Sequence, residues 1–225
     1  MRKIKLIIFD AGDVLYKSVA KEIILGEFRR FVFSYGYNLP ENLEEIWNEV
    51  HWSGIVGNLN FKECNEKLFE RVGVDKRMIH SWLEFYENLW KKHAKREKYV
   101  NEVLIKLKKI GYKLAILSNS ITSEHEKERF LQLSGIEYKL FDKIFTSHDI
   151  GYAKPDKHSY LIVLEYFNHQ PYETVFVGHD EEEITSAKNL GILTVSVKKH
   201  CSKSDYIIKN LIELPKYILL LEESL

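Results

Sequence analysis

The sequence has few cysteines, no excess of either charge and no long apolar run, and each absence excludes a class of protein. The two cysteines, Cys64 and Cys201, lack the spacing of a metal site, so we expect reduced thiols in a cytoplasmic protein. A formal net charge of +0 predicts no nucleic-acid partner. No segment approaches the ~20 apolar residues of a transmembrane helix, so we expect no membrane partner. The N-terminus leads into a short strand and is not expected to be a signal peptide.

What the sequence does contain is enough apolar material for a substantial core, at 45 % of 225 residues. Between about residues 16 and 93 the apolar positions follow a helical period, as at Ile24, Phe28 and Phe31. A glycine-bearing stretch at residues 53–60 interrupts this period. The four tryptophans all lie in the helical block. We expect most of them in its core and one or two facing a cleft.

After the helical block the sequence alternates between predicted helices and predicted strands. Helices are expected at residues 100–110, 124–133, 156–168 and 181–190, and strands at 113–117, 141–146, 174–177 and 192–197. With the apolar run at residues 4–8 as a first strand, this order predicts a doubly wound parallel sheet with right-handed crossovers. We therefore expect an α/β, Rossmann-like core from residues 1–15 and 96–225, with an all-helical cap domain at 16–95.

Polar residues follow four of the predicted strands at the edge where open parallel sheets bind ligands. They are Asp10, the pair Ser118-Asn119, Lys154 before a proline, and the segment from Gly178 to Glu183. A carboxylate such as Asp10 can act as a covalent nucleophile at that edge. Hydroxyl, amide and backbone N–H groups can bind phosphoryl oxygens there, and a lysine can neutralise their charge.

In this order the four segments resemble the haloacid dehalogenase-like hydrolase superfamily, in the branch with a helical cap inserted after the first motif. The resemblance covers the whole sequence. It implies that Asp10 attacks phosphorus and becomes an aspartyl-phosphate, which water then hydrolyses. Ser118, Asn119 and Lys154 would be catalytic residues that bind the phosphoryl group. The implied substrate is a small phosphorylated metabolite, and the protein would be a monomer or a homodimer.

Two positions depart from the pattern of that superfamily. The second acid of the first motif, usually a general acid and base, is replaced by Gly12, and a carboxylate follows one place later at Asp13. In the fourth motif His179 replaces the usual magnesium-binding aspartate, with Asp180 one place later. Glu183 occupies a position that is often acidic. Loss of the second acid predicts slow turnover, least severe for substrates with good leaving groups.

Three outcomes for a metal site follow from these departures. Mg²⁺, which prefers oxygen ligands, would bind Asp10, the Gly12 carbonyl and Asp180, with Glu183 nearby, and this is the outcome we favour. In the second outcome His179 is a ligand and favours a transition metal. Ni²⁺, Mn²⁺ or another divalent ion would then take the place of Mg²⁺. In the third outcome no metal binds.

Three functions remain open at this stage. A metal-dependent phosphatase fits most of the motifs, and residues 53–60 and the segment that follows Asp13 would then select its substrate. A non-catalytic relative with a degraded site would explain Gly12 and His179. A metal-independent 2-haloacid dehalogenase would also explain Gly12, although neither Arg29 nor Arg30 matches an anion-binding arginine.

Overall fold

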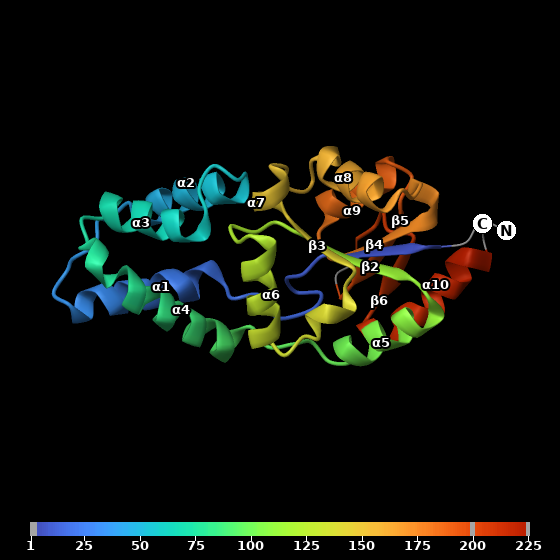
Figure 1. The fold of residues 1–225 in the computed structure, drawn as a ribbon, viewed down its shortest axis with the longest axis horizontal. Coiled ribbons are helices and arrows are strands. Elements are labelled where there is room, and N and C mark those ends of the chain that lie inside the picture. Colours follow the sequence, from blue (N-terminus) through green and yellow to red (C-terminus); the bar gives the residue numbers. More distant parts are fainter. Residues whose placement is uncertain (1–3, 199–200, 224–225) are drawn as a thin grey trace.

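A parallel sheet lies at the centre of the protein in a computed structural model that describes residues 4–198 and 201–223 (Figure 1). Its strand order is β3-β2-β1-β4-β5-β6, and every neighbouring pair is parallel. The chain therefore has the predicted α/β, Rossmann-like fold. The strands are β1 (Leu6–Phe9), β2 (Lys113–Ser118), β3 (Lys143–Thr146), β4 (Thr174–Gly178), β5 (Leu193–Val197) and β6 (Tyr206–Ile208).

The register of the central strands brings the polar segments together. Phe9, the last residue of β1, pairs with Ile116 of β2 and with Val177 of β4. Because parallel strands run in one direction, the residues that follow β1, β2 and β4 emerge at the same edge of the sheet. This edge faces the helical part of the molecule (Figure 1).

Side chains of β1 alternate between two hydrophobic layers. Ile7 and Phe9 pack into a layer that includes residues of α5, α6 and α10, whereas Leu6 and Ile8 pack into a layer formed with α8 and α9. Helices thus cover both faces of the sheet. The helices of this part are α5 (Val100–Ile110), α6 (Glu124–Leu133), α7 (Ser147–Ile150), α8 (Lys157–Phe167), α9 (Glu181–Asn189) and α10 (Leu214–Glu223).

A bundle of helices with its own hydrophobic core extends beyond the strand ends (Figure 1). At the centre of this core, Trp82 packs edge-on against Phe28, and its indole N–H donates to Asn65 Oδ1 at 2.8 Å. The bundle consists of α1 (Lys21–Ser34), α2 (Leu43–Ile55), α3 (Phe61–Arg71) and α4 (Ile79–His93). Short 3-10 turns lie at Lys76–Met78, Tyr138–Leu140, Pro171–Glu173 and Leu211–Glu213. The boundaries of the cap at residues 16–95 stay a prediction.

The predicted elements agree with these bounds to within two residues at nearly every end. One difference is α2, which continues to Ile55 and so shortens the predicted break at residues 53–60. Another is β6, a three-residue strand that the periodicity did not reveal. Its position depends on Asp205, whose Oδ2 accepts hydrogen bonds from the backbone N–H and hydroxyl of Thr194 on β5. Across residues 4–198 and 201–223, no helix combines the length and apolarity needed to cross a membrane.

Candidate active site

Asp10 lies directly after β1, between the strands β2 and β4. Its backbone N–H donates to the Val177 carbonyl at 2.9 Å, which continues the ladder by one residue and fixes the start of the turn. The residue is only 7 % exposed. A carboxylate so deeply buried needs charged or hydrogen-bonding partners, because burial of an isolated charge is costly.

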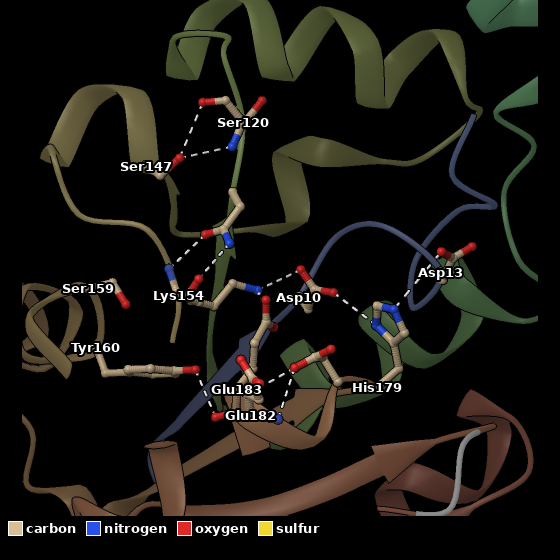
Figure 2. Close-up of polar contacts among 12 residues, drawn as sticks. Asp10, Asp13, Ser120, Ser147, Lys154, Ser159, Tyr160, His179, Glu182 and Glu183 are labelled. Carbon is tan, nitrogen blue, oxygen red and sulfur yellow. Dashed lines mark hydrogen bonds and ion pairs between the residues drawn. The ribbon is translucent and has the colours of Figure 1, made fainter. Parts of the chain in front are cut away.

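Lys154 is the first of these partners. Its ammonium group donates to Asp10 Oδ1 at 2.7 Å and to Glu183 Oε2 at 2.8 Å, and its side chain is fully buried (Figure 2). The Asn119 side chain fixes the backbone that carries this lysine, since its amide donates to the Lys154 carbonyl and its Oδ1 accepts from the Lys154 N–H, both at 2.8 Å. The structure thus gives Asn119 a positioning role toward Lys154.

His179, which follows β4, contacts the other oxygen of Asp10. Its Nδ1 lies 3.2 Å from Asp10 Oδ2, while its Nε2 lies 4.0 Å from Asp13 Oδ2 (Figure 2). The imidazole therefore lies between the two carboxylates of the first motif. Asp10 is held on one side by Lys154 and on the other by His179.

These contacts determine the charge of the site. Burial alone would raise the pKa of Asp10, but the charge and hydrogen bond of Lys154 and the close approach of His179 lower it to about 2. Burial opposes the charge of Lys154, yet Asp10 and Glu183 outweigh it and raise the lysine pKa. Burial, together with the charge of Asp10, raises the pKa of Glu183. Asp10 is therefore an anion and Lys154 a cation at neutral pH.

The turn after Asp10 explains why position 12 is a glycine. A Cβ at Gly12 would lie 2.4 Å from the hydroxyl oxygen of Ser18. Asp13 adopts the left-handed conformation, with a φ of 55°, and its Oδ1 accepts from the Ser18 N–H at 3.0 Å. The carboxylate of Asp13 therefore caps this turn, and its other oxygen is separated from Asp10 by the imidazole of His179.

A cavity of about 310 Å³ lies between the helical bundle and the strand ends, next to Asn119. Its walls are largely aromatic and include Trp47 of α2 and Trp90 of α4, two of the four tryptophans. Residues 53–60 do not line it, whereas Tyr16, Ser18 and Val19 from the segment after Asp13 do. The selection of substrate by these two segments stays a prediction. Besides Asn119, the other aromatic and polar lining residues are Tyr16, Ser18, Lys21, Asn48, His51, Phe61, Tyr86, Ser120, Thr122, Lys127 and Phe130.

Comparison with known proteins identifies the family of this chain. Residues 7–197 match the family described as haloacid dehalogenase-like hydrolase. The chain belongs to this family. As a member of the haloacid dehalogenase-like hydrolases it is a hydrolase.

Individual relatives within this family have different activities. Pyrophosphatase PpaX from Bacillus cereus is 26 % identical over 198 residues, which cover 87 % of this chain and 83 % of the relative. The structure of a 2-haloacid dehalogenase from Pseudomonas syringae superposes with a TM-score of 0.72 at 19 % identity, covering 96 % of this chain and 98 % of the other. A family enzyme from Bacteroides thetaiotaomicron, solved with magnesium and inorganic phosphate, has a TM-score of 0.67 at 23 % identity, covering 87 % and 94 %.

In this structure Asp180 is not turned toward Asp10 as the favoured magnesium site of Asp10, Gly12 and Asp180 would require. Asp180 is the N-cap of α9, and its Oδ1 accepts from the N–H groups of Glu182 and Glu183 at 2.9 and 3.1 Å. The Glu183 carboxylate pairs with Lys154. Within the described part of the chain, no three His, Cys, Asp or Glu side chains are grouped to hold a metal ion.

The donor set that remains next to Asp10 is also unsuited to magnesium. Mg²⁺ requires a near-ideal octahedron of oxygen ligands, and the nearest side chain on the Oδ2 side of Asp10 is the imidazole of His179. The residues present therefore do not fit a magnesium ion, and the imidazole occupies the position beside Asp10.

Sequence reasoning placed Asp10, Lys154 and Glu183 correctly at one edge but missed other features of the site. Ser118 is the last residue of β2 and is buried, and the predicted role of its hydroxyl at the rim stays a prediction. Tyr160 of α8 donates from its hydroxyl to the Glu183 carbonyl at 2.9 Å. The buried Lys127 of α6 was not foreseen, because a lysine on a helix normally faces solvent.

Proposed function

We propose that this hydrolase is a phosphatase that acts on a small phosphorylated compound through an aspartyl-phosphate on Asp10. The observation that carries this proposal is the ion pair between Lys154 Nζ and Asp10 Oδ1 at 2.7 Å, at the ligand-binding edge of the sheet. Pyrophosphatase PpaX, which matches most of the chain, supports phosphate as the group transferred.

The charges around Asp10 suit phosphoryl transfer, in which positioning and charge neutralisation contribute most of the catalysis. The ionised carboxylate supplies the nucleophile. The ammonium of Lys154 is placed to balance the negative oxygens of a phosphoryl group that approaches Asp10. Ser118, at the end of the neighbouring strand, adds a hydroxyl donor.

The reaction then has two steps. A carboxylate oxygen of Asp10 forms a bond to phosphorus as the bond from phosphorus to the leaving oxygen breaks, and solvent protonates that oxygen. A water molecule next attacks the phosphorus of the aspartyl-phosphate, which releases inorganic phosphate and restores the carboxylate. Because Gly12 provides no acid, aryl and acyl phosphates should react faster than alkyl phosphates.

The test is phosphate release from phenyl phosphate and acetyl phosphate by the wild type and by Asp10→Asn, with Asp75→Asn in the bundle as a control. We expect Asp10→Asn to reduce release to background and Asp75→Asn to retain it. ¹⁹F NMR should detect beryllofluoride bound to the wild type and not to Asp10→Asn. Equal release by wild type and Asp10→Asn would exclude Asp10 as the nucleophile.

A carbon–halogen hydrolase is the second candidate, and two observations favour it. Gly12 removes the acid that a phosphatase would use, and the residues beside Asp10 do not fit magnesium. In that reaction the Asp10 carboxylate would displace halide from carbon, and water would then hydrolyse the ester. Halide release from 2-chloropropionate, without phosphate release from the aryl phosphates, would select this candidate.

A further inference from the structure

Lys127 is a second buried lysine near the active site, and its surroundings differ from those of Lys154. It extends from α6, which lies between the helical bundle and the sheet (Figure 1), and it is 4 % exposed. Its ammonium donates to the Tyr16 hydroxyl at 3.0 Å and lies 5.5 Å from the centre of the same ring. Tyr16 belongs to the segment that follows Asp10.

The two buried lysines differ in their counterions. Lys154 has two carboxylates within 3 Å, from Asp10 and Glu183. Within residues 4–198 and 201–223, no carboxylate oxygen lies within 4.0 Å of Lys127 Nζ, and its one hydrogen-bond acceptor is the neutral Tyr16 hydroxyl. Because an ammonium carries three donors and is costly to bury without an anion, Lys127 is left ready to bind one.

The space beside Lys127 can hold such an anion. Lys127 and Tyr16 both line the cavity of about 310 Å³, together with the hydroxyl-bearing Ser120 and Thr122 and the amide of Asn119. Another lysine at this cavity, Lys21, is already paired with Glu44 at 2.5 Å.

The position of the cavity relative to Asp10 indicates that the cavity binds the leaving group of a substrate and not the transferred phosphoryl group. Asp10 and Lys154 are absent from its lining, but Asn119, which holds the Lys154 backbone, is part of it. The charge of Asp10 acts on Lys127 and raises its pKa, whereas burial, the larger effect, lowers that pKa to about 8. Lys127 thus lines a cavity that reaches Asn119, and with a pKa of about 8 it is mostly protonated at pH 7.

We propose that Lys127, with Tyr16, binds a second anionic group carried by the leaving group of the substrate. The inference rests on the proposed phosphatase function and narrows its substrate class to phosphate esters that bear a carboxylate or a further phosphate. The aromatic walls of the cavity, from Trp47, Tyr86 and Trp90, would enclose the carbon skeleton between the two anions.

The test compares phenyl phosphate with its para-carboxy derivative and with hydroquinone bisphosphate, which add a carboxylate or a phosphate to one skeleton. We expect the wild type to prefer at least one of the two compounds that carry a second anionic group. In Lys127→Met, the ratio of kcat/KM for that partner over phenyl phosphate should fall roughly 10- to 100-fold, the loss expected for a hydrogen bond to a charged group. Lys127→Arg should retain most of the ratio, and the exposed Lys106→Met on α5 should leave it unchanged.

An unchanged ratio in Lys127→Met, or an equal fall in Lys106→Met, would overturn the proposal. A binding measurement separates this failure from failure of the phosphatase function. Calorimetric titration of the Asp10→Asn variant with the para-carboxy compound should show affinity that the additional Lys127→Met change lowers roughly 10- to 100-fold. If binding depends on Lys127 but the wild type does not hydrolyse the compound, the phosphatase function is refuted and the anion subsite is supported. If Lys127→Met leaves the affinity unchanged, only the anion subsite is refuted.

Discussion

The Nδ1 atom of His179 lies 3.2 Å from Oδ2 of Asp10, on the side of the carboxylate opposite Lys154. Both oxygens of the proposed nucleophile are therefore in contact with nitrogen atoms. A magnesium ion at Oδ2 would have to displace the imidazole, which already occupies that side of the carboxylate. Asp180 does not offer an alternative ligand there, because its carboxylate is hydrogen-bonded to the N-terminus of α9. The identity of residue 179 should thus control whether this site binds a hard cation.

The first prediction concerns His179→Asp. Two facing carboxylates at residues 10 and 179 repel each other unless a cation lies between them, and oxygen ligands suit Mg²⁺. Calorimetric titration should therefore show Mg²⁺ binding to His179→Asp and no Mg²⁺ binding to the wild type. His179→Asn, of similar size but neutral, is the control and should not gain it. Tight binding of Mg²⁺ or Ni²⁺ by the wild type that is lost in Asp10→Asn would contradict our description of the site.

The second prediction concerns the missing acid at Gly12. Aspartate at this position would place its Cβ 2.4 Å from the Ser18 hydroxyl oxygen, so Gly12→Asp should be combined with Ser18→Ala. The kcat of the double variant for an alkyl phosphate should exceed that of the wild type by up to ~10²–10⁴-fold, the contribution of a general acid. Its effect on phenyl phosphate should be much smaller, because that leaving group needs less protonation.

The control for this experiment is Ser18→Ala alone, which removes the obstructing hydroxyl without adding an acid. The effect of the added acid on kcat is measured as the steady-state rate of phosphate release from substrates whose leaving groups differ in basicity. If the double variant accelerates alkyl and aryl phosphates equally, the turn holds the new carboxylate too far from the leaving oxygen.

The third prediction concerns stability and pH. Burial lowers the pKa of Lys127 from 10.5 to about 8, so between those values the unfolded chain binds more protons than the folded one. The stability contributed by this residue should consequently rise with pH from about 8 to 10.5, by at most about 3 kcal/mol. Lys127→Met should be more stable than the wild type at pH 7 and lose this advantage toward pH 10.5.

Urea unfolding at a series of pH values gives the free energy of unfolding of the wild type and of Lys127→Met. The difference between the two values removes the contributions of other titrating groups. The relevant charges near Lys127 are Asp10, which favours its protonation, and Lys154, which opposes it. A Lys127→Met protein that is less stable than the wild type at every pH would indicate that the lysine stabilises the fold and is not kept for a ligand.

The parts of the site that follow strands could be predicted because parallel strands deliver their carboxyl ends to one edge. Asp10, Ser118 and Glu183 were located by this rule, together with the motif that contains Lys154. Asp180 is the N-cap of α9, a role that an aspartate directly before three glutamates also predicts. That local signal competes with a metal-binding role for Asp180, which stays a prediction.

Other features depend on contacts between distant residues and could not be predicted. Lys127 is buried by contact with Tyr16, 111 residues earlier in the chain, and helical periodicity alone indicates only an amphipathic segment. The strand β6 has three residues, too few for a recognisable alternation. The reason for Gly12 likewise became visible only when the turn brought Ser18 against it.

The reciprocal hydrogen bonds between Asn119 and the Lys154 backbone have a consequence for the ionisation of the nucleophile. Asp10 obtains its low pKa from a lysine 144 positions later, and that lysine is held by one loop and by a glutamate on α9. The charge state of the site is therefore set only when distant segments of the chain are assembled together. A proteolytic nick between β2 and β4 that loosened this assembly would inactivate the enzyme while leaving every catalytic side chain chemically intact.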